Sequence, residues 1–531
     1  MSWKSDKITI VGGGSAGWMT AATLIKFFPH KQITVIESAT VPTVGVGEST
    51  LGQIRGWMHA LDIEPEQFMK ATDASFKLSI KFIDFYKSGA GGFHYPFGRP
   101  FLPKQTQIFG LSDWSLKKAL HPETQVQDYC RTFFPAMSLV DRNRFSRNTD
   151  GQLDNFDCDK NVAFHFDATK FGAWLRDKYC LPKGVQHIIA DVKDVQLGDQ
   201  GIHHLTFGDG QKVAADLYID CTGWKSLLLG SALKEPFISY QDILPNNRAW
   251  ATQVPYVDKK SELEPFTSCT AISNGWVWNI PLWSRIGTGY VYSDKYISKA
   301  AALEEFKTYL RKRMVIADAQ RVEHLDFKDI AMRIGIHQRT WVKNVLAIGL
   351  SAGFIEPLES NGLFTVHEFL LKAVRSLGRE SFTQWDIDTY NLAANTIFNN
   401  FAEFVALHYA LSIRDDSEYW QDISRKSFRS QTIEKLLATT HGFADLSNRK
   451  MFLDRHEEHM GIHCIATGMN YYVADPSLLA HLRYQHPHID YEDVINSLDK
   501  KWKKQQLKWR RAADKAPTLY QYLNRNIYKN S

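Results

Sequence analysis

Hydrophobic and polar positions at the start of the chain follow a strand–helix–strand pattern. The apolar run ITIV enters a glycine turn over residues 8–14, and residues 15–28 then carry apolar side chains at helical spacing. A second apolar run, ITVI, occupies 33–36. Short apolar runs bounded by turn residues are typical of buried strands, so the pattern predicts a βαβ unit.

Further strand-like segments lie at 216–221, 287–293 and 344–349, and a helical pattern follows over 363–376. From about residue 385 onward helical spacing dominates, without a Gly/Pro-rich linker, a repeat or a low-complexity tract. We expect an α/β fold in which a Rossmann-like module (1–384) is interleaved with a second, smaller β-sheet. A helical C-terminal region (385–531) should pack on it as part of a single compact unit.

Composition limits the class of protein. The 531 residues are 44% hydrophobic and include 15 Trp, which is enough to bury a large core. No uncharged apolar run has the length of a membrane helix, and the first residues carry no apolar signal region. The six cysteines are far apart in sequence and form no CxxC pair, which favours buried thiols in a reducing compartment. We therefore expect a soluble cytoplasmic protein.

The net charge of +5 has a local origin. Seven basic residues and no acids lie in 500–511 (KKWKKQQLKWRR), and without them acids slightly outnumber bases. This balance does not favour a nucleic-acid-binding protein. The stretch is interpreted as an amphipathic helix that docks through Trp502, Leu507 and Trp509 and turns its basic face to solvent, with contact to acidic partners as the alternative.

A dinucleotide-binding pattern lies in the βαβ unit. Gly12, Gly14 and Gly17 form G-x-G-x-x-G between strand and helix, and Glu37 ends the second strand. Such glycines let backbone amides approach a pyrophosphate, and the acid accepts hydrogen bonds from ribose hydroxyls. The motif alone does not separate NAD from FAD.

Two later segments favour FAD. Residues 216–223 (DLYIDCTG) and 344–354 (NVLAIGLSAGF) have the form of the second and third flavin-contacting turns of FAD-dependent hydroxylases, and they follow the glycine motif in the same order. No second nicotinamide-type glycine motif is visible. We therefore expect a separate NADH-dependent reductase to supply reduced flavin.

Residues 275–281 read GWVWNIP, and this W-x-W-x-I-P core resembles the signature of flavin-dependent halogenases. Joined to the FAD motif, it makes the chain similar to the tryptophan halogenase family over nearly its whole length. The similarity extends through GVGEST (45–50), SFKLSIKF (75–82), FHFDATKF (164–171), EPFTS (264–268), GTGYVYS (287–293), FIEPLESNG (354–362) and HYALSIRDDSEYW (408–420).

The resemblance implies an enzyme that uses FADH2, oxygen and a halide ion to make hypohalous acid. Trp276 and Trp278 would keep the organic substrate away from the flavin, and the oxidant would travel through the protein to a lysine beside a separate aromatic pocket. The implied FAD contacts are Gly12, Gly13, Gly14, Ser15, Ala16, Gly17, Glu37, Val46, Val192, Leu350 and Leu363.

By motif match the lysine is Lys77. In FKLSIKF, Phe76 and its alternate apolar neighbours would occupy one face of a strand, and Lys77, Ser79 and Lys81 the other. Taken alone, that polar face is most simply solvated. Under the resemblance, the Lys77 amine hydrogen-bonds hypohalous acid or forms a haloamine, and the sequence does not separate the two. Lys81 is the local rival.

The second catalytic match is Glu359, a carboxylate that would accept the proton lost by the halogenated ring. Glu356 is the competing acid. Ser360 would lie between the flavin and substrate sites, and the amides of Asn361 and Gly362 correspond to the halide-binding pair of the family.

Two departures from the family pattern bear on specificity. Asn361 stands where compared enzymes have Thr, which leaves the preference among chloride, bromide and iodide open, with a bias to bromide or iodide as one alternative. Residues 446–464 contain no Trp or Tyr, and no Glu at the position expected for holding free tryptophan. We expect an indole or phenol rather than free tryptophan, with Tyr95, Pro96 and Phe97 as an aromatic wall.

Other functions were weighed. His456, His459, His463 and Cys464 share a helical face, but without HExxH spacing or a distant partner motif, so a polar lid is favoured over a metal site. A flavin aromatic monooxygenase and a flavoprotein without turnover are the alternatives to a halogenase. The sequence does not decide between a monomer and a homo-oligomer.

Overall fold

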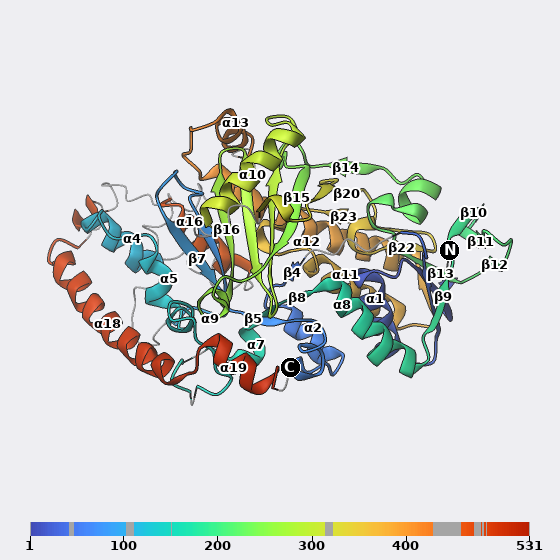
Figure 1. Ribbon diagram of the computed structural model, residues 1–531, viewed down its shortest axis with the longest axis horizontal. Helices are drawn as coiled ribbons and strands as arrows, with labels where there is room; N and C mark the ends of the chain where they lie inside the picture. The colour runs from blue at the N-terminus through green and yellow to red at the C-terminus, as the bar shows by residue number, and fades with distance from the viewer. Residues whose placement is uncertain are drawn as a thin grey trace.

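The computed structural model describes residues 2–41, 47–101, 111–149, 151–154, 156–313, 322–427, 458–471, 479–480, 483–484 and 486–529. Figure 1 shows an elongated body. One sheet lies at the end that carries the N-terminus, a second lies in the centre, and helices lie along the opposite end. Within these ranges, no helix combines the length and low charge that crossing a membrane requires.

The predicted βαβ unit is confirmed. Strand β2 (Lys7–Val11), helix α1 (Ser15–Phe27) and strand β3 (Gln32–Glu37) follow one another, and β2 pairs with β3 in parallel. Parallel strands covered on both faces need continuous apolar runs, and four of the five residues of β2 are buried.

These strands belong to a six-stranded sheet in the order β21-β22-β13-β2-β3-β9. The added strands are β9 (Gln186–Ile189), β13 (Leu217–Asp220), β21 (Trp341–Val342) and β22 (Val345–Ala347). Only β21 joins antiparallel. Helix α11 (Phe364–Leu377) packs against α1, which confirms the helix predicted after the third turn.

The register of this sheet brings the three predicted turns together. Asp220 pairs with Val11 on one side and with Ala347 on the other, so β2, β13 and β22 end level with one another. Gly12 has φ +117°, and a Cβ there would lie 2.2 Å from the carbonyl oxygen of Cys221. Only glycine permits this close approach between the first two turns.

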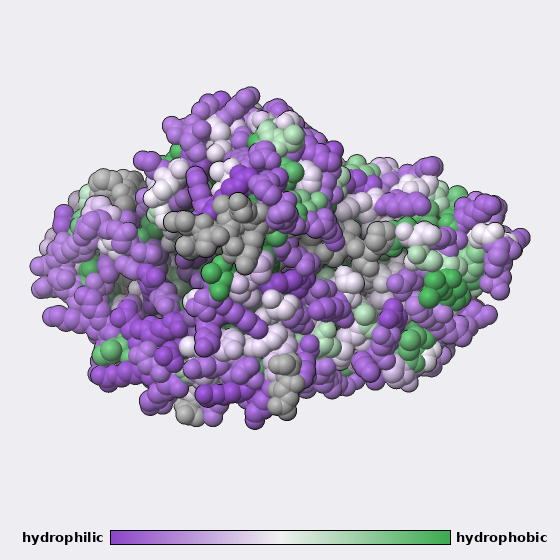
Figure 2. Space-filling model, in the orientation of Figure 1, coloured by the Kyte–Doolittle hydropathy of each residue, from purple (hydrophilic) through white to green (hydrophobic). Residues whose placement is uncertain are grey.

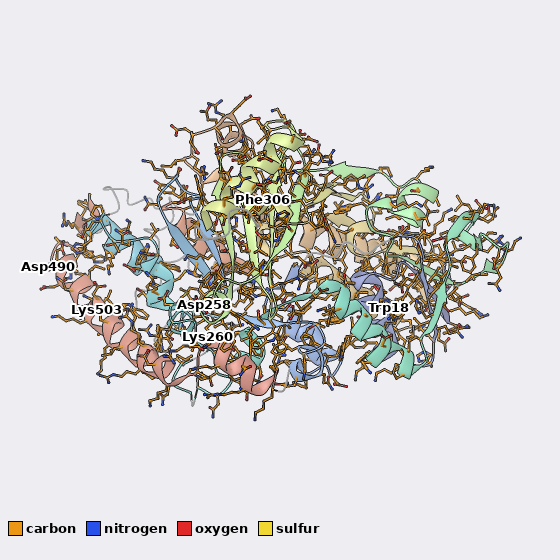
Figure 3. All side chains as sticks on the ribbon, viewed as in Figure 1. Trp18, Asp258, Lys260, Phe306, Asp490 and Lys503 are labelled. Carbon is orange, nitrogen blue, oxygen red and sulfur yellow. The ribbon has the colours of Figure 1, made fainter. Side chains whose placement is uncertain are left out.

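A second sheet holds seven strands in the order β19-β15-β18-β17-β16-β6-β7. It was expected to be the smaller sheet, but in the described part of the chain it has one strand more than the first. Its strands are β6 (Ser79–Ile83), β7 (Gly92–Pro96), β15 (Arg248–Val254), β16 (Phe266–Ile272), β17 (Gly275–Pro281), β18 (Ile286–Tyr292) and β19 (Lys328–Ala331). Helix α10 (Lys299–Arg313) packs against this sheet, with Phe306 beside Tyr290 (Figure 3).

A small antiparallel sheet lies beside the seven-stranded one. It consists of β4 (Gly47–Ser49), β8 (Ala163–Asp167) and β5 (Ser75–Lys77), with β8 in the middle. After β8 the chain enters α8 (Ala168–Trp174), which packs against α1. The motifs GVGEST, FKLSIKF and FHFDATKF therefore meet in one place between the two larger sheets.

The segment after residue 385 is helical where it is described. Its helices are α12 (Gln384–Ala410), α13 (Glu418–Ser427), α16 (Glu458–Gly468), α18 (Tyr491–Lys515) and α19 (Leu519–Asn526). Figure 1 shows α18 running along the outer edge of the molecule beside α4 (Leu111–Leu120) and α5 (Asp128–Phe133).

The basic stretch is a docked amphipathic helix, as predicted. On α18, Trp502 packs edge-on against Phe133 at 4.7 Å and Trp509 is buried. Leu507, expected on the docked face, is instead 47% exposed, because its position places it on the solvent side of the helix. Figure 2 shows a largely hydrophilic surface at this edge, where Figure 3 labels Lys503.

Candidate active site

Lys77 is the last residue of β5 and is fully buried. The solvated face expected for this segment is wrong, because the segment is two strands and not one. At Leu78 the backbone N–H turns to the carbonyl of Pro265, and the chain passes from the small sheet into β6 of the large one. Both sheets then cover the lysine. Lys81 is partly exposed, with its amine 5.6 Å from the centre of the Phe266 ring.

The Lys77 amine has two hydrogen-bond acceptors. It donates to the carbonyl of Thr50 at 2.9 Å and to the hydroxyl of Ser360 at 2.8 Å. The centre of the Phe97 ring lies 5.0 Å away. Burial lowers the pKa of Lys77 to about 7, although the Glu359 carboxylate opposes the shift. A substantial share of the amine is therefore neutral, and thus nucleophilic, at neutral pH.

A chain of buried hydroxyls continues from Lys77. Ser360 donates to Ser49 at 3.1 Å, and Ser49 lies 2.6 Å from the hydroxyl of Thr267. Thr267 in turn contacts His165 at 2.9 Å. Three of the quoted motifs (GVGEST, EPFTS and FHFDATKF) supply these groups, and sequence reasoning gave them no role.

The two competing acids have different surroundings. Glu359, in the short 3-10 helix Pro357–Glu359, is fully buried and electrostatically coupled to Lys77. Glu356, one turn earlier, accepts a hydrogen bond from the amide of Asn246 at 2.5 Å. Burial raises the pKa of Glu356 to about 7, and the nearby polar groups of Tyr409, Asn246 and Trp276 oppose the rise. Glu356 therefore belongs to a separate buried network.

Glu359 has a close partner that sequence reasoning missed. Nε2 of His408 lies 2.8 Å from Oε1 of Glu359, and neither side chain is exposed. Burial raises the pKa of Glu359, while His408 and Lys77 lower it. His408 stands at the head of HYALSIRDDSEYW, so a signal was present in the sequence, but nothing near it in the chain points to Glu359.

The turn after Glu359 fits an anion. Ser360 adopts the left-handed conformation (φ +58°), and α11 begins three residues beyond Asn361. Neither the Asn361 nor the Gly362 amide donates a hydrogen bond to another described residue. Two free amides before a helix N-terminus favour a negative ion. The Asn361 amide side chain points back to the carbonyl of Ile355 at 3.2 Å.

The paired tryptophans lie on one face of β17, as predicted. The rings of Trp276 and Trp278 are 6.1 Å apart and both are buried. Trp278 pairs across the sheet with Gly289 of β18. A Cβ on Gly289 would lie 2.2 Å from the Trp278 indole, so GWVWNIP and GTGYVYS are complementary strands.

The predicted aromatic wall lies on and just after β7. Tyr95 packs edge-on against Phe97 and also against Phe404, each at 6.0 Å. Helix α16 covers it closely, because a Cβ on Gly461 would lie 3.0 Å from the Tyr95 ring. Pro96 ends the strand, with Phe97 buried beside Lys77.

The polar lid predicted in this region is described only in part. Residues 446–457, including His456, lie outside the described residues, as do the side chains of His459 and His463. Cys464 on α16 is buried. The described residues contain no group of three or more metal-ligating side chains.

The glycine turn fits a dinucleotide. Helix α1 has no side chain capping its N-terminus and no acid in its first turn, which leaves its amides for a phosphate. A Cβ on Gly13 would lie 2.3 Å from the Glu37 carboxyl, so the acid sits directly against the turn. Trp18 of α1 (Figure 3) packs edge-on against His187, which holds Glu37 at 2.9 Å.

The other predicted flavin contacts lie around the same edge of the sheet. Leu350 follows Gly349. A Cβ added to Gly349 would lie 2.9 Å from the Cβ of Ala16. Leu363 precedes α11, and Val192 begins strand β10 (Val192–Gly198) just beyond β9. Val46 lies outside the described residues. Their contact with FAD stays a prediction.

Residues 7–478 match the family model described as tryptophan halogenase. The chain belongs to the tryptophan halogenase family. It is 34% identical over 452 residues to the tryptophan 6-halogenase SttH of Streptomyces toxytricini, covering 81% of this chain and 83% of that one. The structure of VirX1 in its apo form matches with a TM-score of 0.89 and 35% identity, over 99% of this chain and 100% of that one.

A third relative is named as a flavin-dependent halogenase. BrvH, a flavin-dependent halogenase from Brevundimonas sp. BAL3, matches with a TM-score of 0.81 and 29% identity over 98% of this chain and 99% of that one. Members of the family are enzymes that use FADH2, oxygen and halide. The predicted fold and enzyme class are thereby confirmed.

Proposed function

We propose that the enzyme halogenates an electron-rich arene with hypohalous acid that Lys77 directs. The observation that carries the proposal is the buried group of Lys77, Ser360 and Glu359, which continues into the two free amides at Asn361 and Gly362. A halide site and a proton acceptor thus flank one amine. Reduced FAD, when bound at the glycine turns, would activate O2, which is the oxidant of the reaction.

The atoms and electrons of the overall reaction balance. FADH2, O2, a halide ion, a proton and the arene give FAD, the aryl halide and two waters. In the last step the arene attacks the halogen of HO–X, the O–X bond breaks, and the hydroxide leaves as water after taking a proton. The ring then loses its own proton, so that step consumes and releases one proton.

Lys77 would hold the oxidant in one of two ways. As an ammonium it donates a hydrogen bond to hypohalous acid, and as a neutral amine it forms a haloamine and water. Its lowered pKa makes both forms accessible near neutrality. In either form, hydrogen bonds to Thr50 and Ser360 fix the amine and aim the halogen at one ring position.

Glu359 would accept the ring proton. A carboxylate beside the reacting carbon also stabilises the cationic intermediate. Glu356 is less suited to this role, because Asn246 holds it in another network. The Trp276–Trp278 pair would close the flavin side to bulky organic molecules while a small oxidant passes.

We infer that the preferred substrate is an indole or phenol without an amino-acid head group. The support is the sequence of 446–464, which contains no Trp or Tyr and has no Glu at the position expected for holding free tryptophan. Asn361 beside the halide amides supports bromide or iodide over chloride. Free tryptophan is the second candidate, because relatives such as SttH are named for it.

The experiment combines the protein with FAD, a separate flavin reductase and NADH. Indoles, phenols and tryptophan are offered with chloride, bromide or iodide, and products are identified by mass spectrometry. We expect halogenated indole or phenol, most with bromide or iodide. Efficient conversion of free tryptophan would overturn the substrate assignment, and hydroxylated products without halide dependence would indicate a monooxygenase.

A further inference from the structure

His408 lies in the last turn of α12, enclosed by aromatic rings. The Phe82 ring is 4.6 Å from the imidazole and the Phe404 ring 5.6 Å, centre to centre. The open direction of the ring is toward Glu359, whose Oε1 lies 2.8 Å from Nε2. Among the described residues, no other side chain lies at ion-pair distance from Glu359.

The second ring nitrogen indicates where the protons are. Nδ1 lies 3.1 Å from the carbonyl oxygen of Phe404. A carbonyl can only accept, so Nδ1 is assigned the hydrogen. A neutral imidazole would then turn the lone pair of Nε2 toward an oxygen of Glu359. Two unprotonated acceptors 2.8 Å apart would repel each other, so the contact is favourable when one of them carries a proton, although the two atoms do not meet the geometry of a directed hydrogen bond.

We propose that His408 is a positioning residue whose Nε2 contact stabilises the ionised form of Glu359 and so keeps Glu359 a carboxylate, ready to receive the proton of the halogenated ring. The inference rests on the proposed function. In the step it serves, the ring C–H bond breaks, its electron pair restores the aromatic system, and the proton forms an O–H bond with Glu359.

Groups from several elements face this pair. They are Lys77 from β5, Cys269 from β16 and Cys464 from α16. Burial raises the pKa of both cysteines, so they remain neutral thiols. Lys77 is thus the remaining cation. Burial raises the pKa of the Glu359 carboxyl, and His408 is the larger of the two influences that oppose the rise.

The test replaces the imidazole by an amide, which cannot become a cation by taking up a proton. His408→Gln is compared with His337→Gln as a matched control. His337 is also buried. Its Nδ1 lies 3.0 Å from the carbonyl oxygen of Glu235, away from the site. Two rates are measured from pH 6 to 10, namely arene halogenation and the formation of hypohalous acid.

We expect His408→Gln to slow arene halogenation at pH 7 by roughly tenfold or more. The lost activity should return as pH rises, because Glu359 without His408 ionises only at higher pH. Hypohalous acid formation should persist, and His337→Gln should change neither rate. An unshifted pH profile in His408→Gln would overturn the proposal, whether the rate falls or not.

A ring-deuterated substrate gives a second readout. Proton loss should become rate-limiting in His408→Gln, so a primary isotope effect absent from the wild type should appear at pH 7. If His408→Gln does not bind FAD, the smaller His408→Asn takes its place with the same expectations. Wild-type protein that forms hypohalous acid but no aryl halide would overturn the proposed function itself, and a wild-type isotope effect equal to that of the variant would overturn the role of His408.

Discussion

Lys77 combines two properties that rarely occur together in a lysine: complete burial and no ion-pair partner among the described residues. The amine satisfies its hydrogen bonds with neutral oxygens of Thr50 and Ser360. Burial lowers the pKa of Lys77 to about 7 in the folded protein. The charged amine is therefore less favourable in the folded protein than in the unfolded chain. The residue proposed to aim the oxidant therefore destabilises the fold.

This cost gives a prediction for Lys77→Met. The folded-state pKa lies below the unfolded value, so the penalty is full below about pH 7 and fades as pH approaches 10.5, the ordinary lysine value. After allowing for two lost hydrogen bonds, we expect the variant to be more stable at pH 6 by roughly 1–3 kcal/mol, and by less at pH 9. Chemical unfolding at both pH values measures it. A variant less stable at pH 6 would contradict the buried amine.

The two acids give a second prediction. Glu359→Gln removes the proposed proton acceptor, so arene halogenation should fall by roughly 100-fold while FAD binding is unchanged. Glu356→Gln should retain the chemistry but lower stability, because the amide offers Asn246 and Tyr409 one acceptor oxygen where the carboxylate offers two. Turnover by each variant is compared with its melting temperature. The reverse pattern would assign the catalytic role to Glu356.

At this scale the sequence predicts some residues and not others. Lys77 and Glu359 follow from motif resemblance. The burial of Lys77 does not, because its partner Ser360 is 283 positions away and the alternation with Ser79 and Lys81 is what a solvated strand shows. His408 could not be joined to Glu359 without the fold, since their contact depends on how α12 lies against the turn.

Among the elements, β17 and β18 make the partition between the proposed sites. The Trp278 ring lies against the backbone at Gly289, so a side chain at position 289 would overlap the ring. The strand GWVWNIP therefore needs the glycine of GTGYVYS opposite it. The alternation in 275–281 correctly placed both indoles on one face. The need for glycine opposite could not be predicted, because register between strands is not visible in one strand.

Gly289→Val tests this partition. The added side chain overlaps the Trp278 ring, and we expect it to cost about 1–3 kcal/mol of stability and to displace the indole. Hypohalous acid should then escape into solution and halogenate an added scavenger. Chemical unfolding and the ratio of scavenger to arene product measure the two effects. Gly287→Val is a poor control because its position is buried, so Gly208→Val, where a Cβ meets nothing, serves instead.

Over the whole molecule, distant segments are tied into one body. Helix α18 lies on α5 through Trp502 and on Phe101 through Trp509, and Lys117 of α4 forms an ion pair with Asp499 at 2.8 Å. The helix and its docked face were predictable from the spacing of its tryptophans. The order of strands in the seven-stranded sheet was not, since β6 and β16 pair across almost 190 positions.

This docking predicts unequal effects along α18. Trp509→Ala should destabilise the protein by roughly 3–5 kcal/mol, because it empties a buried aromatic site. Lys503→Glu on the exposed face should change stability by less than about 0.5 kcal/mol. Thermal and chemical unfolding of both variants decide the matter. A large loss from Lys503→Glu would mean that the basic face is itself packed against a partner.

The most direct measurement separates making the oxidant from using it. Hypohalous acid and halogenated indole are quantified together for the wild type, Lys77→Met and the neighbouring control Lys81→Met. With a scavenger of free hypohalous acid present, the wild type and Lys81→Met should yield halogenated indole, and Lys77→Met should form hypohalous acid but no halogenated indole at any pH. Substantial halogenated indole from Lys77→Met would contradict the central role of the buried amine.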